Sequence, residues 1–175
     1  GEIVLKHRKI NVLEIAQHVY AIGDRLGVAQ TALGTIGMDI CADNFRDALV
    51  LAHSLARMGA RLLLSPCAWA VDADHDNAKD PYGGPWKEAY ATIARLYEIP
   101  VVGVSNVGWL RGGPWEGRKC IGCSLAVGRS GDVIAQGPYG EEAQALIPVE
   151  IEVTPAEVKG TAISGWLRKR GSQDS

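Results

Sequence analysis

The sequence predicts an α/β fold in which helices cover a mixed β-sheet. Two short and almost wholly apolar runs, 61–65 and 101–106, are typical of strands buried on both faces of a sheet. A helical pattern precedes each run, at 44–58 and at 86–97, and a hairpin pattern follows the second. Because strands and helices alternate before the hairpin, we expect a layered arrangement with a mixed sheet.

Length and composition fit one folded domain. The chain has 175 residues, of which 47% are hydrophobic and 22% charged, and its formal net charge is −2. These values exclude a disordered chain and do not favour a nucleic-acid or membrane partner. The longest apolar runs are far too short to span a bilayer. Four cysteines in a chain of this length do not predict a disulfide scaffold, so we expect a cytoplasmic location.

The first elements are short and extended. Residues 2–6 alternate apolar and polar side chains, which predicts a strand with one buried face. Residues 11–20 fit either irregular chain or a short helix, and both interpretations stay open. The glycines and aspartate at 23–27 predict a turn. Two strands are then expected at 28–33 and 35–41.

A helix should follow the second of these strands. Asp43 or Asn44 can accept a hydrogen bond from a free N–H group of the first turn, which predicts a helix start there. The apolar stripe continues to about Met58, and Gly59 is a natural helix end.

Long loops and a hairpin complete the predicted domain. The loop 66–85 is rich in Asp, Gly and Pro, and the loop 107–119 carries two tryptophans; long loops of this kind tend to be functional. The hairpin pairs 120–127 with 132–136, and a late strand is expected at 146–153.

The C-terminal residues close the domain. Pro in the first turn predicts a helix start at 154–157. We expect one domain at 1–164 and a polar tail at 165–175.

Cys41 carries the strongest functional signal. It lies in the segment 37–44, where a glycine-punctuated apolar run ends and a helix pattern begins. At such a turn, backbone N–H groups and the positive end of a helix dipole favour a thiolate and stabilise an oxyanion. An ordinary small buried cysteine is the alternative.

Three segments together resemble the nitrilase, or carbon–nitrogen hydrolase, superfamily. They are Lys6-His7-Arg8-Lys9-Ile10, similar to the family's lysine motif; the segment 37–44, similar to its cysteine elbow; and the segment 59–69, similar to the strand after the elbow helix. The resemblance covers roughly residues 1–153. It implies a four-layer α-β-β-α sandwich, of which this chain holds one layer pair and part of the other.

The resemblance implies roles for individual residues. Cys41 would attack an amide carbonyl or nitrile carbon and form a covalent thioester or thioimidate. Lys9 would stabilise the charge developing on the substrate, since an ammonium beside a thiol supports an oxyanion. The backbone N–H of Ala42 would be a second donor. Glu14, the only glutamate between Lys9 and Cys41, would be the structural or substrate-orienting glutamate of many members, with a plain solvated glutamate as the alternative.

The same resemblance places residues around the substrate. Asp43 and Asn44 follow the nucleophile, and Asn106 follows a buried strand. Cys67 ends another strand near the site, where it is expected to shape the pocket rather than to react. Trp69 lines the pocket or packs in the core or an interface, and these alternatives stay open.

One part of the family pattern has no match. Members carry a glutamate well before the lysine, which takes the thiol proton and later activates water. This chain begins just before the lysine, and Glu2 lies on the same predicted strand as the lysine motif. We therefore expect the resemblance to cover only the C-terminal part of the fold, and this chain alone to be catalytically inactive.

Other chemistry has weaker support. Cys120 and Cys123 have the spacing of a zinc or redox pair, but no second Cys or His pair accompanies them, so no metal is expected. The acidic residues and histidine at 72–76 are a weak metal pattern. A Cys–His hydrolase that uses His53 with Cys41 is conceivable, although the predicted helix separates the two residues by more than three turns.

The expected partner is a small-molecule amide or nitrile, and no cofactor is required because thioester chemistry runs on side chains. The resemblance implies a homodimer or larger oligomer formed through residues 44–58 and 86–97. Two other functions stay open: a transferase or glutaminase of the same fold, and a non-catalytic structural subunit.

Overall fold

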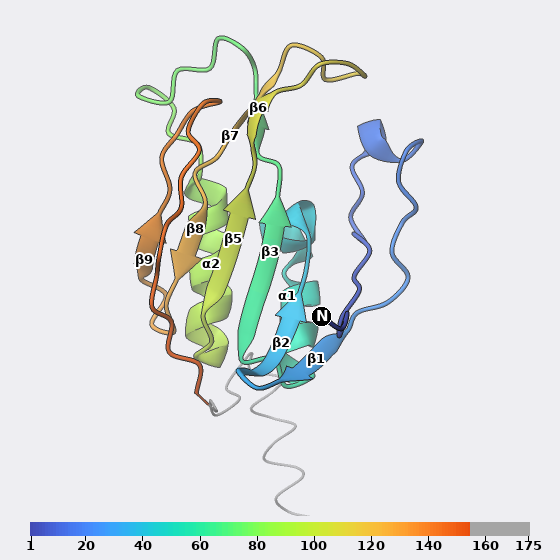
Figure 1. Ribbon diagram of the computed structural model, residues 1–175, viewed down its shortest axis with the longest axis vertical. Helices are drawn as coiled ribbons and strands as arrows, with labels where there is room; N and C mark the ends of the chain where they lie inside the picture. Colours follow the sequence, from blue (N-terminus) through green and yellow to red (C-terminus); the bar gives the residue numbers. More distant parts are fainter. Residues whose placement is uncertain (155–175) are drawn as a thin grey trace, which may run out of the picture.

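A six-stranded mixed sheet organises the chain, of which the computed structural model describes residues 1–154. The strands lie in the order β1-β2-β3-β5-β8-β9 (Figure 1). Their bounds are Val28–Thr31 (β1), Gly34–Met38 (β2), Leu62–Cys67 (β3), Val101–Ser105 (β5), Leu125–Val127 (β8) and Val133–Gln136 (β9). Strands β2, β3 and β5 are parallel neighbours, and the outer pairings are antiparallel. The carboxyl ends of the three central strands therefore meet at one edge of the sheet.

A small three-stranded sheet lies beyond that edge, in the order β4-β7-β6 (Figure 1). Its strands are Ala70–Val71 (β4), Val107–Trp109 (β6) and Lys119–Ile121 (β7). β4 and β6 follow β3 and β5 closely along the chain. The loops predicted at 66–85 and 107–119 thus each contribute a short strand and extend past the central sheet.

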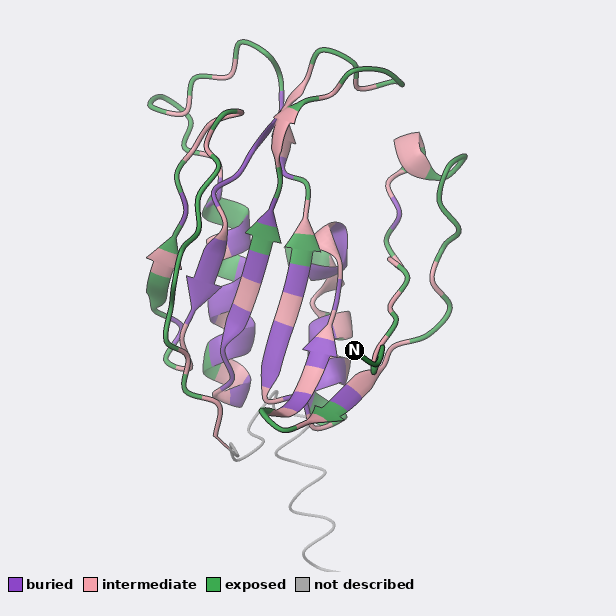
Figure 2. Cartoon of the chain, viewed as in Figure 1, coloured by how far each residue is buried: buried purple, intermediate pink, exposed green. Residues whose placement is uncertain are grey.

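Two helices cover one face of the six-stranded sheet (Figure 1). Helix α1 spans Val50–Arg57 and ends at Gly59, whose φ of 100° is easy only for glycine. Helix α2 spans Gly84–Tyr97, begins with Pro at its first turn and ends at the left-handed Glu98. The core lies between these helices and the sheet (Figure 2), with fully buried side chains at Leu55, Leu63, Ile93, Val101 and Val127.

No helix of residues 1–154 covers the opposite face of the sheet (Figure 2). Strand side chains alternate between faces, so Leu64 and Val102 point to this side and are half-buried. Pro66 and Val104 lie further toward the carboxyl edge on the same side and are exposed, Val104 by 60%.

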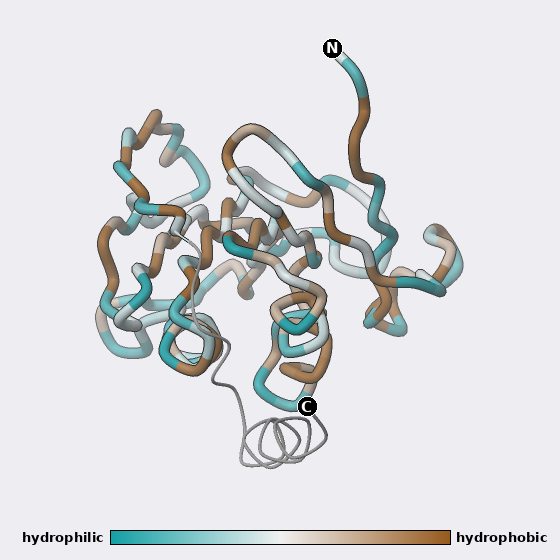
Figure 3. The backbone as a smooth tube through the Cα atoms, turned by 90° about the horizontal axis from the view of Figure 1, so that it is seen from below, coloured by the Kyte–Doolittle hydropathy of each residue, from teal (hydrophilic) through white to brown (hydrophobic). Residues whose placement is uncertain are grey.

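Residues 1–27 form an N-terminal arm beside the sheet. The arm runs along the side of β1 and β2, makes one turn of 3₁₀ helix at Glu14–Ala16 (η1) and returns to β1 (Figure 1). The peptide N–H of Gly23 donates to the Lys9 carbonyl at 2.8 Å and joins the two halves of the arm. Figure 3 shows the N-terminal end of the chain projecting away from the helices. Ile3 and Val4 in this segment are exposed.

The strands at 28–33 and 35–41, the helix at 86–97 and the strands at 61–65 and 101–106 are confirmed with small shifts of their bounds. The strand expected at 2–6 is wrong, because that extended segment pairs with no neighbouring strand within residues 1–154. The turn expected at 23–27 is also wrong, since the arm reverses earlier, at 17–20.

The helix after Cys41 begins later than predicted. Cys41–Asn44 forms a 3₁₀ turn (η2) and Arg46–Ala48 another (η3), and α1 starts only at Val50. Phe45 interrupts the pattern, because its ψ of 157° is extended. Asp43 and Asn44 do not cap α1, since their side chains bind elsewhere.

Two predictions near the C-terminus need correction. The predicted strand 120–127 is split between the two sheets, because Gly122 and Cys123 both have positive φ. The strand expected at 146–153 is wrong, as that segment is extended but unpaired among the described residues. The helix expected at 154–157 and the boundary at 164 lie outside the described residues, apart from Thr154. No helix in residues 1–154 has the length and apolar character needed to cross a membrane.

Candidate active site

Cys41 forms a strained elbow at the carboxyl end of β2. It is the first residue of η2 and has a φ of 51°, a left-handed conformation that a side chain rarely adopts. Such strain costs about 1–3 kcal/mol and clusters at functional sites. The thiol belongs to a half-buried residue, so it combines partial access with a fixed backbone.

Parallel strands bring two other predicted residues to the same edge. Cys67 is the last residue of β3, and Asn106 directly follows β5. The Asn106 N–H donates to the Cys67 carbonyl at 3.2 Å, which ties these strand ends together. The fold therefore places Cys41, Cys67 and Asn106 at the carboxyl ends of β2, β3 and β5, the three parallel strands of the mixed sheet.

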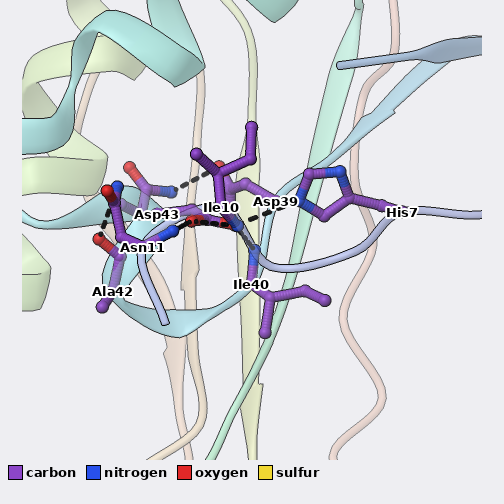
Figure 4. A network of polar contacts seen from close by, with 8 residues as sticks. His7, Ile10, Asn11, Asp39, Ile40, Ala42 and Asp43 are labelled. Carbon is purple, nitrogen blue, oxygen red and sulfur yellow. Dashed lines mark hydrogen bonds and ion pairs between the residues drawn. The ribbon is translucent and has the colours of Figure 1, made fainter. Parts of the chain in front are cut away.

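The Asp43 carboxylate joins the elbow to the lysine segment (Figure 4). It accepts hydrogen bonds from the peptide N–H groups of Ile10 at 3.0 Å and Asn11 at 2.7 Å, and His7 Nε2 lies 3.0 Å from its other oxygen. The N–H of Ile40, one residue before Cys41, donates to it at 3.1 Å. We call this arrangement of His7, Ile10, Asn11, Ile40 and Asp43 the Asp43 clamp.

Hydrogen bonding dominates the charge state of Asp43. The residue is completely buried, and burial alone would raise its pKa. The hydrogen bonds from His7, Asn11 and Ile40 outweigh burial, so the pKa is lowered. Asp43 therefore stays ionised at the centre of the clamp.

Lys9 lies within the segment that the clamp holds and is half-buried. The charges of Lys9 and Cys41 both affect the pKa of Cys67. Burial raises the pKa of Cys67 well above its usual range, a Cys41 thiolate raises it further, and the Lys9 ammonium acts in the opposite direction. Lys9 and Cys41 therefore both lie close enough to Cys67 for their charges to act on its thiol.

Asp39 and Asn44 lie completely buried behind the elbow. Asn44 Nδ2 donates to Asp39 Oδ2 at 3.0 Å. Burial, with a smaller contribution from the Asp43 charge, raises the pKa of Asp39 to about 6. Ala42 is also buried, and its carbonyl accepts a hydrogen bond from Asn11 Nδ2 at 3.5 Å. Asp43 and Asn44 therefore support the elbow from within and do not line an open surface.

Trp69 packs in the core. Its ring stacks on Trp86 with centroids 4.7 Å apart, and it is 1% exposed. The backbone N–H of Trp69 donates to Ser105 Oγ at 3.0 Å. Trp69 therefore packs in the core as one of the two interpretations expected, and its role in lining the pocket stays a prediction.

Glu14 lies apart from the clamp. It is exposed on η1 and lines a wide, shallow hollow of about 530 Å³ with His18, Pro114 and Trp115. The arm and the loop after β6 therefore face each other across this hollow.

Sequence reasoning missed several residues around the thiol. Tyr82, in the loop before α2, has its pKa raised by burial and, in part, by the charges of Cys41 and Cys67. The Tyr90 hydroxyl lies 3.9 Å from Cys67 Sγ. An isolated tyrosine in a loop or helix carries no signal of its own. His7 was visible in the basic segment, but its carboxylate partner lies 36 positions away.

The weaker candidates are two cysteines and a histidine. Cys120 and Cys123 are buried free thiols, and burial raises the pKa of each. His53 Nδ1 lies 2.8 Å from the Tyr97 hydroxyl between the two helices. Within residues 1–154, no group of three or more His, Cys, Asp or Glu side chains is arranged to hold a metal ion.

Fold and site together define a class: α/β proteins with a cysteine at a strained strand-to-helix elbow and a lysine segment fastened to it. The chain belongs to the carbon-nitrogen hydrolase family, whose model matches residues 1–157. The comparison with curated protein sequences gives no match.

Solved structures of the nitrilase superfamily share this fold. A carbon-nitrogen hydrolase from Helicobacter pylori matches with a TM-score of 0.70 and 23% identity over 81% of this chain and 50% of its own. Nit3 of Saccharomyces cerevisiae matches with a TM-score of 0.62 and 25% identity over 81% of this chain and 47% of its own.

A third structure is an amidase mutant from Nesterenkonia sp. whose active-site cysteine carries acrylamide. Its TM-score is 0.56, with 19% identity over 77% of this chain and 47% of the amidase. The chain thus spans about half the length of these solved relatives. The α/β fold predicted from the sequence is confirmed as that of the nitrilase superfamily.

Proposed function

We propose that the protein hydrolyses non-peptide C–N bonds of small amides, N-carbamoyl compounds or nitriles through Cys41. The observation that carries this proposal is the strained Cys41 elbow, to which the Asp43 clamp fastens the Lys9 segment. Membership of the carbon-nitrogen hydrolase family supports the reaction class. The Nesterenkonia amidase, with acrylamide on its active-site cysteine, supports a small amide as substrate.

The proposed chemistry has two covalent steps. With an amide, the Cys41 thiolate forms an S–C bond to the carbonyl carbon, the C–N bond breaks, and the protonated nitrogen leaves as ammonia or amine. Water then attacks the thioester, which releases the acid and regenerates the thiol. The Lys9 ammonium and the Ala42 N–H stabilise the oxyanion of each tetrahedral intermediate. With a nitrile, the first adduct is a thioimidate.

Two further roles in the proposed site concern a substrate-orienting glutamate and the general base. We propose Glu14 as a substrate-orienting carboxylate, supported by its place on the hollow beside Trp115. None of the described residues is assigned as the base that takes the thiol proton. The expected inactivity of these 175 residues alone therefore stays a prediction, and turnover by this polypeptide would contradict it.

Specificity and assembly are further parts of the proposal. Asn106 and Cys67 at the strand ends, together with the loop that carries Tyr82, are the proposed substrate surroundings.

We infer a homo-oligomer formed through α1 and α2, supported by the exposed Val50 and Met58 at the two ends of α1. Four free cysteines support a reducing, cytoplasmic compartment.

Iodoacetamide labelling with peptide mapping tests the nucleophile. Cys41 should be alkylated at neutral pH much faster than Cys120 or Cys123, which are buried thiols with raised pKa values. In a polypeptide that also supplies the general base, ammonia release from short amides should disappear in Cys41→Ala and persist in Cys120→Ala. An unreactive Cys41 would favour a structural subunit, and acyl transfer to added hydroxylamine in preference to water would favour a transferase.

A further inference from the structure

Asp43 holds a position that the reaction chemistry does not explain. It lies two residues after the nucleophile, yet its carboxylate is completely buried and faces the arm. Its Oδ1 accepts from the N–H groups of Ile10 and Asn11, and its Oδ2 accepts from His7 and from the N–H of Ile40. A carboxylate offers about four lone-pair positions. All are used by the protein itself, so Asp43 has none left for a substrate or a proton transfer.

The partners of Asp43 bracket Lys9 in the sequence. His7 precedes the lysine by two residues, and Ile10 and Asn11 directly follow it. A segment held on both sides has its backbone direction fixed at the residue between. The Ile40 N–H binds the same carboxylate, so one anchor locates the residues next to Lys9 and the residue next to Cys41 (Figure 4).

The arm has few other attachments near this point. Asn11 Nδ2 reaches the Ala42 carbonyl at 3.5 Å, a long hydrogen bond, and the Gly23 bond to Lys9 stays within the arm. Apolar anchoring is limited to the buried Val12 and to Leu26, which packs against the core where the arm meets β1, while Val19, Tyr20 and Ile22 are exposed. The charged hydrogen bonds of the clamp are therefore the main link between arm and elbow.

We propose that Asp43 is a positioning residue that sets the Lys9 ammonium against the Cys41 thiol by anchoring both backbones to one ionised carboxylate. This inference rests on the proposed roles of Lys9 and Cys41. Without the anchor, the arm samples positions in which Lys9 does not face the thiol, and the competent fraction of molecules falls.

A double-mutant cycle on thiol reactivity tests the proposal without requiring turnover. The variants are Asp43→Asn, Lys9→Met and the double mutant, and the measured quantity is the rate of Cys41 alkylation by iodoacetamide at neutral pH. Asn keeps the size of Asp but turns an NH₂ group toward N–H donors. Each single change should slow alkylation by roughly ten- to hundredfold, as for the loss of one charged hydrogen bond, and the double mutant should be no slower.

Controls separate positioning from unfolding. Cys120 and Cys123 should stay unlabelled in every variant, because they react only if the core opens. Asp24→Asn, at an exposed aspartate of the same arm, should leave the Cys41 rate unchanged. His7→Ala removes one clamp contact without altering the elbow and should give a smaller loss. If Cys120 and Cys123 become labelled in Asp43→Asn, that variant is unfolded, and His7→Ala replaces it in the double-mutant cycle with Lys9→Met.

Two outcomes would overturn the proposal. One is an unchanged rate of Cys41 alkylation in the Asp43→Asn and His7→Ala variants. The other is a double mutant whose rate falls by the product of the two single-mutant factors. If Lys9→Met alone has no effect, the proposed function fails at its lysine. The anchor is then still tested by hydrogen exchange, because the Ile10 and Asn11 amides should exchange faster in Asp43→Asn than in Asp24→Asn. Equal exchange in these two variants would refute it.

Discussion

Two aspartates four positions apart have opposite ionisation behaviour. Both are completely buried, but Asp43 accepts several N–H groups and Asp39 accepts chiefly from Asn44. Hydrogen bonds to the charged form lower the pKa of Asp43, whereas burial raises that of Asp39 to about 6. Burial alone therefore does not decide the charge of these two carboxyl groups. The number of hydrogen-bond donors around each group also contributes.

Asp39 should make the protein less stable as the pH rises. Its pKa is higher in the folded than in the unfolded chain, so the folded state binds the proton more tightly, and stability is lost as the pH rises from 3.8 through about 6. The shift corresponds to about 3 kcal/mol. Urea unfolding of wild type and Asp39→Asn at about pH 4 and about pH 7.5 should show this loss in the wild type only.

Asn is the suitable replacement because its carbonyl oxygen can still accept from Asn44 Nδ2. Both proteins share every other titrating group, so their difference isolates position 39. A parallel fall in stability for wild type and variant would mean that Asp39 is not the group responsible.

At the residue scale, the sequence yields candidate residues but not the contacts that hold them in place. Cys41 and Lys9 were recognisable from local patterns, a glycine-punctuated strand end and a basic segment. The role of Asp43 was not, because its partners lie 32 to 36 positions away and no local pattern encodes a carboxylate bound by main-chain N–H groups. The stacking of Trp69 on Trp86 was also not predictable, because the two rings are 17 positions apart in the sequence.

At the scale of elements, predictions succeeded where periodic burial was strong. Strands β3 and β5 and helix α2 follow their apolar patterns closely. The segment 2–6 has the alternation of a strand but no partner among the described residues, and alternation does not supply a hydrogen-bonding neighbour. The late start of α1 has a similar origin, because tertiary hydrogen bonds took the side chains of Asp43 and Asn44 that would have capped it.

Close packing between β5 and α2 gives a prediction at this scale. A Cβ on Gly103 would overlap the hydroxyl and ring of Tyr90, which is completely buried and lies beside Cys67. Gly103→Ala should therefore lower the free energy of unfolding by about 1–3 kcal/mol, as overpacking of a core does. Chemical denaturation measures the change.

Gly84→Ala is the matched control. Gly84 begins α2, and a Cβ there would meet no atom within 4 Å. Alanine should leave stability unchanged or raise it slightly, since it is the better helix former. Equal losses at positions 103 and 84 would contradict the packing argument.

The whole molecule combines a packed sheet with a weakly attached arm. β3 and β5 are buried against two helices, while the arm depends on the Asp43 clamp and a few apolar contacts. Stability should therefore be uneven across the chain.

Native-state hydrogen exchange should reveal this difference. Amides of β3 and β5 should open with free energies at least about 3 kcal/mol above those of residues 13–22. Within the arm, Ile10, Asn11 and Gly23 should exchange more slowly than their neighbours, because their N–H groups are hydrogen-bonded. Uniform protection along the arm and sheet would show that the arm is an integral part of the cooperative core.

Under the proposed function, the left-handed backbone at Cys41 decides which substitution gives an inert form of the protein for trapping bound ligands. Alanine removes the sulfur but retains a Cβ, so the peptide stays under the same steric restraint and the neighbouring amide keeps its direction. Glycine would relax that restraint and raise the free energy of unfolding. The elbow would then no longer hold the Ala42 N–H in one direction. A complex of Cys41→Ala would thus retain the backbone geometry around a bound ligand, and a complex of Cys41→Gly would not.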